Sequence, residues 1–266
     1  MTSTPVADEA DLERRFGGLS RLYGPAAYAR LRQARVAVVG IGGVGSWAAE
    51  ALARSGVSAI CLVDMDHIAE SNINRQIHAL TPTLGQAKVE AMRERIALIH
   101  PGCQVQCVDD FVDEDNVDAL LGQAHAQAPL DGLIDCCDQV RAKAALAAWA
   151  WQHQVPLVTV GAAGGKAWPH RVECADLADV THDPLLASMR QRLRQRHEAP
   201  RKGAMQVPCV FSREAVRAPQ QSCDVAAQGD GSLNCHGYGS SVTVTATFGM
   251  TAAACLINLW TAPAKE

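Results

Sequence analysis

Three features are scarce or missing in this chain of 266 residues. Aromatic residues make up only 5% of it, so no aromatic platform for stacking RNA bases can be assigned from the sequence. No two of the ten cysteines have the C-x-x-C spacing, and the adjacent Cys136 and Cys137 cannot replace it. The N-terminus has neither a basic start nor an apolar stretch, so no secretory signal is readable. We therefore expect a cytoplasmic protein whose thiols are mostly reduced and buried.

Hydrophobic residues make up 48% of the chain, which is ample for a substantial core. Short β-branched runs alternate with Ala-rich or amphipathic segments, and this alternation predicts an α/β fold with a Rossmann-like, doubly wound, mostly parallel sheet. The predicted strands are 36–39, 59–63, 104–108, 132–136 and 157–160, and the predicted helices are 44–55, 86–100, 116–123 and 140–154. We expect one domain over 1–266, with an N-terminal helical segment (1–34), a nucleotide-binding core (35–161) and an elaborated C-terminal half (162–266).

One uncharged segment, residues 240–260, is long enough to cross a bilayer. Ser and Thr occupy six of its positions, and "VTVT" alternates with the period of a strand before the segment becomes helical in character. We therefore expect a buried strand followed by a core helix, with membrane association as the alternative.

A glycine-rich turn, "GIGGVG" at residues 40–45, follows the first predicted strand. Gly40, Gly42 and Gly45 fit the G-x-G-x-x-G fingerprint, in which the glycines permit a tight turn, a close backbone approach to phosphate and close packing of helix on strand. Asp64 follows the next strand, at the place where an acidic residue usually binds ribose hydroxyls. The turn predicts a bound nucleotide, and it does not distinguish a redox dinucleotide from a nucleotide that is cleaved.

Three further polar residues distinguish a site for a redox dinucleotide from a site that cleaves a nucleotide. Arg75, Lys88 and Asp138 each have an ordinary alternative, as an ion-pair residue, a solvated helix residue and a helix cap. Together they supply cations for developing phosphate charge and a carboxylate for magnesium. A hydride-transfer site needs no such set, so we expect a site that breaks a triphosphate.

The motifs "SNINRQ", "GQAKVE" and "DCCDQVRAK", together with the glycine turn, resemble those of the ubiquitin-activating-enzyme-like (ThiF/MoeB) superfamily, which adenylates carboxylates with ATP. More narrowly, "RFGGLSRLYG", "INRQIHAL", "LVTVGAAGG" and "TVTATFG" resemble the bacterial tRNA threonylcarbamoyladenosine dehydratases over nearly the whole chain. The resemblance implies activation of the threonine carboxylate of the modified tRNA nucleoside by ATP, followed by ring closure with loss of water.

The resemblance also implies roles for individual residues. Phosphate would contact Gly42, Gly43 and Gly45, ribose would contact Asp64, and the triphosphate would be neutralised by Asn72, Arg75 and Lys88. The other residues expected to bind the nucleotide are Gly40, Asp66, Asn74 and Gln76. Asp138 would bind Mg²⁺, and Arg21 is a candidate second arginine contributed across a homodimer.

One departure from the superfamily pattern matters. Many sulfur-carrier-activating relatives hold zinc with two C-x-x-C pairs, which this chain lacks, so we expect no zinc and rank adenylation of a ubiquitin-like sulfur carrier second. Cys235, in a glycine-rich loop beside His236, is interpreted as an incidental or buried thiol. Sulfur transfer with a cysteine desulfurase partner stays open as a side role, as does a noncatalytic adaptor.

A basic run lies between residues 190 and 202, in a chain whose net charge is −4. Its cationic residues are Arg190, Arg192, Arg194, Arg196, Arg201 and Lys202, and Glu198 is the lone acid among them. Phosphate contacts provide affinity without sequence information, so the run predicts a tRNA-binding surface, with a plain exposed helix as the alternative.

Overall fold

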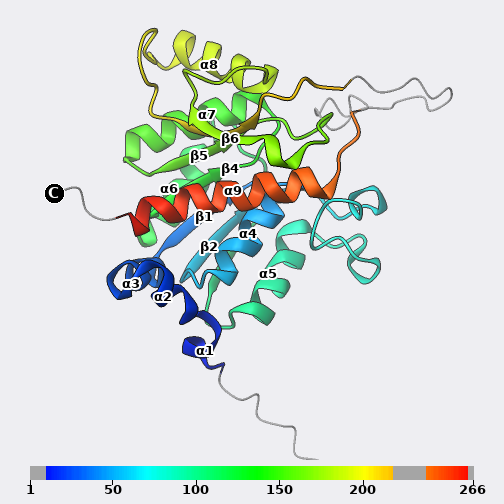
Figure 1. The fold of residues 1–266 in the computed structure, drawn as a ribbon, viewed down its shortest axis with the longest axis vertical. Helices are drawn as coiled ribbons and strands as arrows, with labels where there is room; N and C mark the ends of the chain where they lie inside the picture. Colours follow the sequence, from blue (N-terminus) through cyan, green and yellow to red (C-terminus); the bar gives the residue numbers. More distant parts are fainter. Residues whose placement is uncertain (1–9, 218–237, 263–266) are drawn as a thin grey trace, which may run out of the picture.

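The computed structural model describes residues 10–217 and 238–262, and within them a seven-stranded sheet forms the centre of the molecule (Figure 1). The strand order is β3-β2-β1-β4-β5-β7-β6, in which β6 pairs antiparallel with β7 and every other pairing is parallel. The strands are β1 Arg35–Val39, β2 Ala59–Val63, β3 Gln104–Val108, β4 Gly132–Asp135, β5 Leu157–Val160, β6 Val172–Asp176 and β7 Pro208–Ser212.

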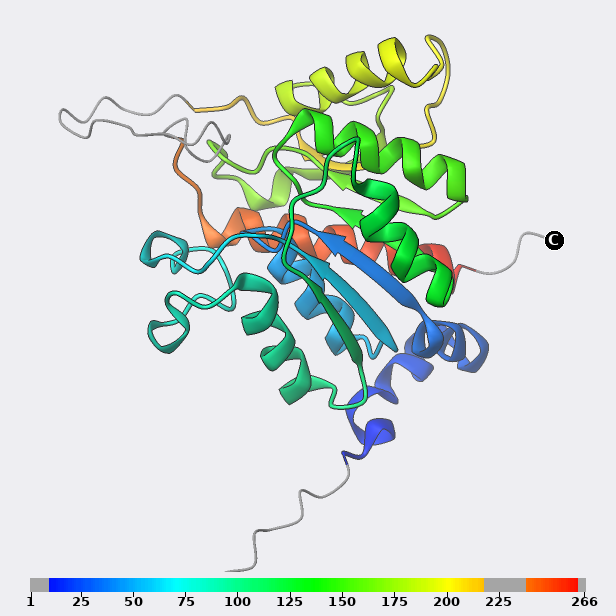
Figure 2. The same ribbon diagram turned by 180° about the vertical axis from the view of Figure 1, so that it is seen from behind.

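Helices cover both faces of the sheet. One face packs against α3 (Pro25–Gln33), α4 (Gly45–Arg54), α5 (Lys88–Ile99) and α9 (Val242–Thr261). The other packs against α6 (Val117–Gln127), α7 (Val140–His153) and α8 (Pro184–Arg196), and Figure 2 shows α6 and α7 in front of the strands. Two short helices, α1 (Leu12–Phe16) and α2 (Gly18–Tyr23), precede α3.

The side chains of β1 show how the sequence divides the core. Val36 and Val38 contribute to the cluster beneath α4 and α9, whereas Ala37 and Val39 contribute to the cluster beneath α7. Successive side chains of a strand point to opposite faces, so a run without polar residues is buried on both sides. The α/β, mostly parallel fold predicted from such runs is confirmed.

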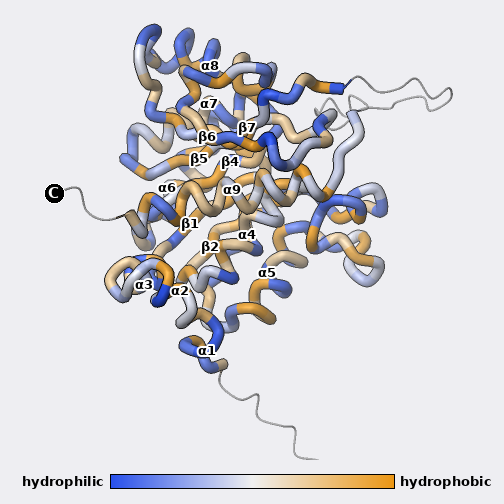
Figure 3. The backbone as a smooth tube through the Cα atoms, in the orientation of Figure 1, coloured by the Kyte–Doolittle hydropathy of each residue, from blue (hydrophilic) through white to orange (hydrophobic). Residues whose placement is uncertain are grey.

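The prediction of a strand at the start of 240–260 is wrong, because Val242–Thr261 forms a single helix, α9. Val244, Phe248, Ala252 and Leu256 recur every four residues and are fully buried. Burial of this helical stripe outweighs the local strand-like alternation. Along the tube in Figure 3, α9 and the strands beneath it carry the apolar colours, whereas α8 is largely hydrophilic.

Among the described residues, α9 is also the one helix long and apolar enough to cross a membrane. In the structure it lies across the sheet and packs against α4 (Figure 1). A Cβ added to Gly249 would lie 2.3 Å from the carbonyl oxygen of Val44, so α9 contacts the start of α4 backbone to backbone. These contacts support the interpretation of α9 as a core helix.

Candidate functional site

The glycine turn joins β1 to α4, and two of its glycines cannot be replaced without a clash. Gly40 has φ +85°, and a Cβ there would lie 2.9 Å from the carbonyl group of Cys136. A Cβ on Gly45 would lie 1.8 Å from the carbonyl oxygen of Gly40. A side chain in either position would open the turn, so these glycines set its shape.

The outer side of the turn is more open. The nearest atom to a Cβ added at Gly42 is Nε2 of Gln76, at 3.9 Å, and a Cβ at Gly43 would lie 3.3 Å from the Arg75 side chain. The turn leads directly into the N-terminus of α4, where backbone N–H groups and the helix dipole favour an anion. Gln76 and Arg75 therefore flank the position that phosphate is predicted to occupy.

Asp64 follows β2 directly, and its carboxylate forms a hydrogen bond with the backbone of the glycine turn. Its Oδ2 accepts a hydrogen bond from the backbone N–H of Ile41 (2.6 Å), and its Oδ1 accepts one from the N–H of Asp66 (2.9 Å). Burial raises the pKa of the Asp64 carboxyl, although Lys88 and the two N–H groups oppose the rise. A carboxylate has about four acceptor sites, so Asp64 can hold the turn and still accept from a ribose hydroxyl.

Lys88, the first residue of α5, is brought to the same place. Its side chain is only 7% exposed, and Nζ lies 2.5 Å from Asp66 Oδ2 and 3.7 Å from Asp64 Oδ1. Asp66 is open to solvent, at 63% exposed. The structure thus places the predicted ribose residue and the predicted phosphate cation in contact with each other, at the carboxyl ends of the strands.

The segment around Arg75 connects β2 to α5 and lies over the glycine turn. Its backbone is held by Trp47 of α4, whose Nε1 donates to the carbonyl of Arg75 (2.9 Å), while Arg75 Nη1 donates to Ser71 O and Asn74 Oδ1. Asn72 Oδ1 accepts from the N–H of Ala69 and so closes the short turn before Arg75. These bonds fix the direction of the Arg75 side chain.

Gln76 and Asn74 differ in their surroundings. The Gln76 side chain is buried, and within residues 10–217 and 238–262 its Oε1 has no hydrogen-bond partner. Asn74 is exposed, and its Nδ2 donates to the carbonyl of Ser240, just before α9 (3.1 Å). An unpaired buried amide oxygen is costly, so Gln76 is suited to a contact with a ligand that donates.

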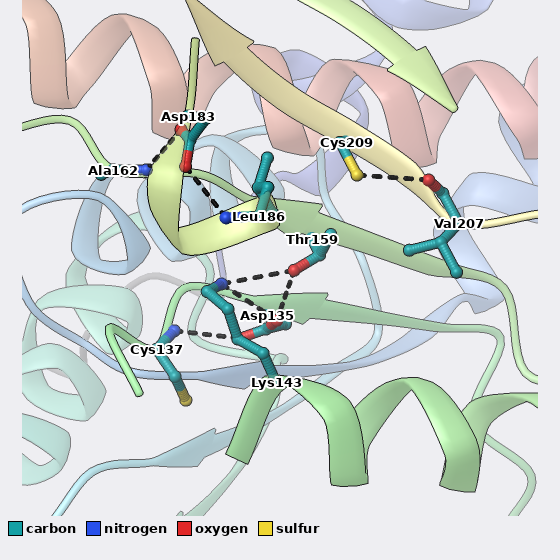
Figure 4. Close-up of polar contacts among 9 residues, drawn as sticks. All are labelled: Asp135, Cys137, Lys143, Thr159, Ala162, Asp183, Leu186, Val207 and Cys209. Carbon is teal, nitrogen blue, oxygen red and sulfur yellow. Dashed lines mark hydrogen bonds and ion pairs between the residues drawn. The ribbon is translucent and has the colours of Figure 1, made fainter. Parts of the chain in front are cut away.

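The carboxyl end of β4 contains a buried polar cluster that the sequence did not reveal (Figure 4). Lys143 Nζ from α7 lies 3.0 Å from Asp135 Oδ2 and 3.3 Å from Thr159 Oγ1, and all three side chains are fully buried. Asp135 also accepts hydrogen bonds from Thr159 Oγ1 and, through Oδ1, from the N–H of Cys137. Burial alone would lower the pKa of Lys143, but the Asp135 carboxylate raises it above its ordinary value.

This cluster changes how the two acids of the "DCCD" segment are interpreted. Asp135 is a structural ion-pair residue, not a ligand group presented to solvent as its place at a strand end suggests. Asp138 lies three residues further on, half-buried, in the loop between β4 and α7. Burial raises the pKa of the thiols of Cys136 and Cys137 in the same loop, so both stay protonated. Cys235 lies outside the described residues.

Arg21 is not near this site within one chain. It is exposed on α2, which packs against α3, and α3 leads into the amino end of β1. The glycine turn follows the carboxyl end of β1, at the opposite edge of the sheet (Figure 1).

The structure places the members of the basic run in different surroundings, and their contact with tRNA stays a prediction. Arg190 does not belong to an open cationic surface, because its Nη1 donates to the carbonyls of Leu177 and Val180 (2.9 Å each) within the fold. Arg192 pairs with Glu114, an acid outside the run, with Nη2–Oε1 at 2.5 Å.

The remaining members of the run are Arg194, which is half-buried and donates to the carbonyl of Pro200, and the exposed Arg196, Arg201 and Lys202. The chain between Arg196 and Arg201 lines a cleft with Pro156 and Leu157, at the amino end of β5. The exposed cations therefore lie towards the edge of the sheet opposite the glycine turn.

Comparison with known proteins agrees with this geometry. The ThiF family model matches residues 14–266. The chain is 47% identical over 247 residues to the tRNA threonylcarbamoyladenosine dehydratase of Escherichia coli (strain K12), with 90% of each chain covered.

Two solved structures are similar over almost the whole fold. One is E. coli tRNA N6-threonylcarbamoyladenosine dehydratase, TcdA, in complex with ATP, with a TM-score of 0.82, 44% identity, and coverage of 94% of this chain and 96% of that one. The other is the same protein in complex with AMP, with a TM-score of 0.83, 44% identity, and coverage of 97% and 98%. From the match over residues 14–266 and these relatives, the chain belongs to the ThiF family.

Proposed function

We propose that this chain is an enzyme that uses ATP to remove water from N6-threonylcarbamoyladenosine in tRNA, giving the cyclic form of the nucleoside. The observation that carries the proposal is the gathering of the glycine turn, Asp64, Arg75 and Lys88 at one edge of the sheet. The E. coli relative, which is named for this reaction and is similar over almost all of the chain, has been solved with ATP and with AMP.

The chemistry follows from the weakness of a carboxylate oxygen as a leaving group. One carboxylate oxygen of the threonyl group attacks the α-phosphorus of ATP, and pyrophosphate leaves. An atom of the substrate's own carbamoyl group then attacks the activated carbonyl carbon and loses its proton, and AMP leaves with the former carboxylate oxygen. The nucleophile is already tethered, so no nucleophilic side chain is required.

The described residues supply what the first step needs. Backbone N–H groups at the start of α4 would hold phosphate, and Lys88 and Arg75 would stabilise the negative charge that develops as pyrophosphate departs. Lys88 is held in place by Asp64 and Asp66 before the reaction. Such preorganised charge costs no rearrangement at the moment of reaction.

The remaining predicted site residue, Asp138, is suited to bind magnesium. Mg²⁺ usually binds through one or two carboxylates plus phosphate oxygens, and Asp138 is a half-buried carboxylate in the loop after β4. Within the described residues no three His, Cys, Asp or Glu side chains form a metal cage, so the nucleotide would supply the other ligands. When bound, Mg²⁺ would neutralise charge on the phosphates, while the Asp135–Lys143 pair keeps the loop that carries Asp138 in place.

A homodimer is proposed on the position of Arg21. This exposed side chain lies at the amino edge of its own sheet, so it would contribute to a nucleotide site only from a second copy. Mixing Arg21→Ala chains with Lys88→Ala chains would test this, because a shared site gives partial recovery of activity and separate sites give none.

The function itself is tested on the nucleoside. The purified chain is incubated with ATP, Mg²⁺ and tRNA that carries threonylcarbamoyladenosine. The tRNA is then digested to nucleosides, and the mass of the modified nucleoside is measured by mass spectrometry. We expect a loss of one water per modified nucleoside, with one AMP formed for each, and no loss without ATP. A nucleoside of unchanged mass, with the enzyme shown to bind ATP, would refute the proposal.

A further inference from the structure

An exposed tryptophan lies in the loop between β5 and β6. Trp168 has 47% of its surface exposed, and among the Phe, Trp and Tyr residues that the structure describes only Phe111, at 51%, is comparably exposed. Burying so large an apolar ring would be favourable, so its exposure has a cost unless something covers it. The ring is thus a candidate contact for a partner.

The backbone beneath Trp168 is fixed from two sides. The buried Glu214 accepts hydrogen bonds from the N–H groups of Ala167 (3.1 Å) and Trp168 (2.9 Å). The buried Lys166 donates to the carbonyls of Ser212 (3.1 Å) and Glu214 (2.9 Å). These bonds attach the loop to the end of β7, so the ring is presented by a rigid support.

Two arginines and a histidine contact the ring. The guanidinium carbons of Arg217 and Arg171 lie 5.6 Å and 5.8 Å from its centroid, within the range of a cation–π contact. His170 meets it edge-on, with centroids 5.7 Å apart. Within residues 10–217 and 238–262, Glu214 forms an ion pair with Arg217, and it is buried and already bonded to the loop. An exposed ring flanked by two exposed arginines suits a partner with flat rings and negative charge.

The position of the loop relates this group to the nucleotide site. The N–H of Gly165 donates to the carbonyl of Gly239 (2.9 Å), and the next carbonyl, Ser240 O, accepts from Asn74, the neighbour of Arg75. The loop also follows the carboxyl end of β5, the edge at which the glycine turn lies. The exposed cations after α8 lie towards the other edge.

We propose that Trp168 stacks on an unpaired base of the tRNA anticodon loop beside the modified adenosine, while Arg171 and Arg217 contact the adjacent phosphates. This inference rests on the proposed function and names the surface that holds its RNA substrate. Stacking of an unpaired base on an aromatic ring is a common way to hold single-stranded RNA, and arginines beside the ring add phosphate contacts.

The test uses an anticodon stem-loop RNA that carries threonylcarbamoyladenosine, with 2-aminopurine as the neighbouring base. We expect its fluorescence to be quenched when the wild-type chain binds, because stacking quenches this base. Trp168→Ala is expected to weaken binding about tenfold or more and to remove most of the quenching, and Trp168→Phe to retain most of both. Arg171→Gln and Arg217→Gln should each lower the slope of log affinity against log salt by about 0.7.

The matched control is Leu98→Ala, which removes an 82% exposed apolar side chain from α5 and should leave RNA binding unchanged. Trp168→Ala is also expected to keep the ATP affinity and melting temperature of the wild type. Wild-type RNA affinity and quenching in Trp168→Ala would overturn the inference and leave Trp168 as a contact for another protein. Loss of ATP affinity together with RNA affinity would also overturn the inference, because it would show that Trp168 stabilises the fold and does not act through RNA contact.

Binding of the stem-loop is measured without turnover, so the two proposals fail separately. A wild-type chain that dehydrates the nucleoside while Trp168→Ala binds RNA normally refutes only the stacking surface.

Discussion

The ammonium of Lys143 lies 3.0 Å from the carboxylate of Asp135, and neither side chain is exposed. Removing one partner of such a pair leaves an uncompensated charge in the core, which typically costs about 3–5 kcal/mol. We expect Lys143→Met to lower the free energy of unfolding in urea by about that amount. Thr159→Val, which removes one hydrogen bond to Asp135, should cost only about 1 kcal/mol. Equal stability of Lys143→Met and the wild type would show that the pair does not hold the end of β4.

Lys88→Ala and Asp138→Ala should separate catalysis from folding. Loss of one preorganised charge typically lowers the rate by 10²-fold or more, about 3 kcal/mol, so we expect both variants to lose ATP-dependent dehydration. Asp64 retains its two backbone hydrogen bonds in Lys88→Ala, so circular dichroism should show an intact fold. Leu98→Ala, which changes an 82% exposed side chain in the last turn of α5, is the control. Near-normal turnover by either variant would refute its assigned role.

Substitution by alanine should have different effects on stability at two glycines of the turn. A Cβ on Gly45 would lie 1.8 Å from a carbonyl oxygen, so Gly45→Ala is expected to distort the turn and to lower both the melting temperature and the ATP affinity. A Cβ on Gly42 meets nothing closer than 3.9 Å, so Gly42→Ala should melt near the wild-type temperature while binding ATP more weakly. The two measurements are differential scanning fluorimetry and ATP titration. Unchanged ATP affinity in Gly42→Ala would argue against phosphate contact there.

The buried imidazole of His78 should make the free energy of unfolding depend on pH. It is buried, its Nε2 donates to the carbonyl of Ile41 in the glycine turn (2.9 Å), and burial lowers its pKa to about 4. Between the ordinary value of 6.5 and about 4, the unfolded chain binds a proton that the folded chain does not. Stability should therefore be full above that window and fall as the pH drops through it, by up to about 3 kcal/mol. Urea unfolding from pH 7 to pH 4 should show a shallower loss in His78→Gln, and identical profiles would contradict the assignment.

A cysteine pair allows α9 to be linked covalently to the sheet. The Sγ atoms of Cys174 on β6 and Cys255 on α9 lie 2.8 Å apart. Oxidised glutathione should join them as a disulfide, with two thiol hydrogens transferred to two reduced glutathiones. Closing a loop of this length would stabilise the fold by roughly 4 kcal/mol. Mass spectrometry should show a linked peptide that dithiothreitol separates and that Cys255→Ser lacks, and the absence of the link in the wild type would contradict the prediction.

The parts of the fold that the sequence predicted have strong local signals. Strands β1, β2, β4 and β5 are mostly apolar and almost entirely buried, and Gly40 and Gly45 occupy positions where any side chain would clash. Strands β6 and β7 were not predicted, because "VECAD" contains two acids and "PCVFS" begins with proline, and both depend on pairing with distant chain. In α9, tertiary burial outweighed local alternation.

In the candidate site, too, some residues have local sequence signals and others depend on partners distant in the chain. Asp64 follows a strand, Lys88 begins a helix, and Arg75 and Gln76 lie in a recognisable motif between them. The structure brings the four to one edge, while their roles towards ATP stay predictions. Long-range partners could not be predicted. In the sequence nothing distinguishes Lys143 from a surface lysine of an Ala-rich helix, because its partner Asp135 comes from another element. The carbonyls that bind Arg190 come from a loop before α8.

The backbone contact between Gly249 and Val44 has a consequence for biosynthesis. The nucleotide turn is synthesised before α9, the helix that packs against it, so the two meet only after the intervening chain has been made. A nascent or truncated chain that ends before α9 leaves Val38 and Ala48 without cover. Such a chain is expected to expose apolar surface of this core cluster and to be prone to aggregation until α9 packs against it.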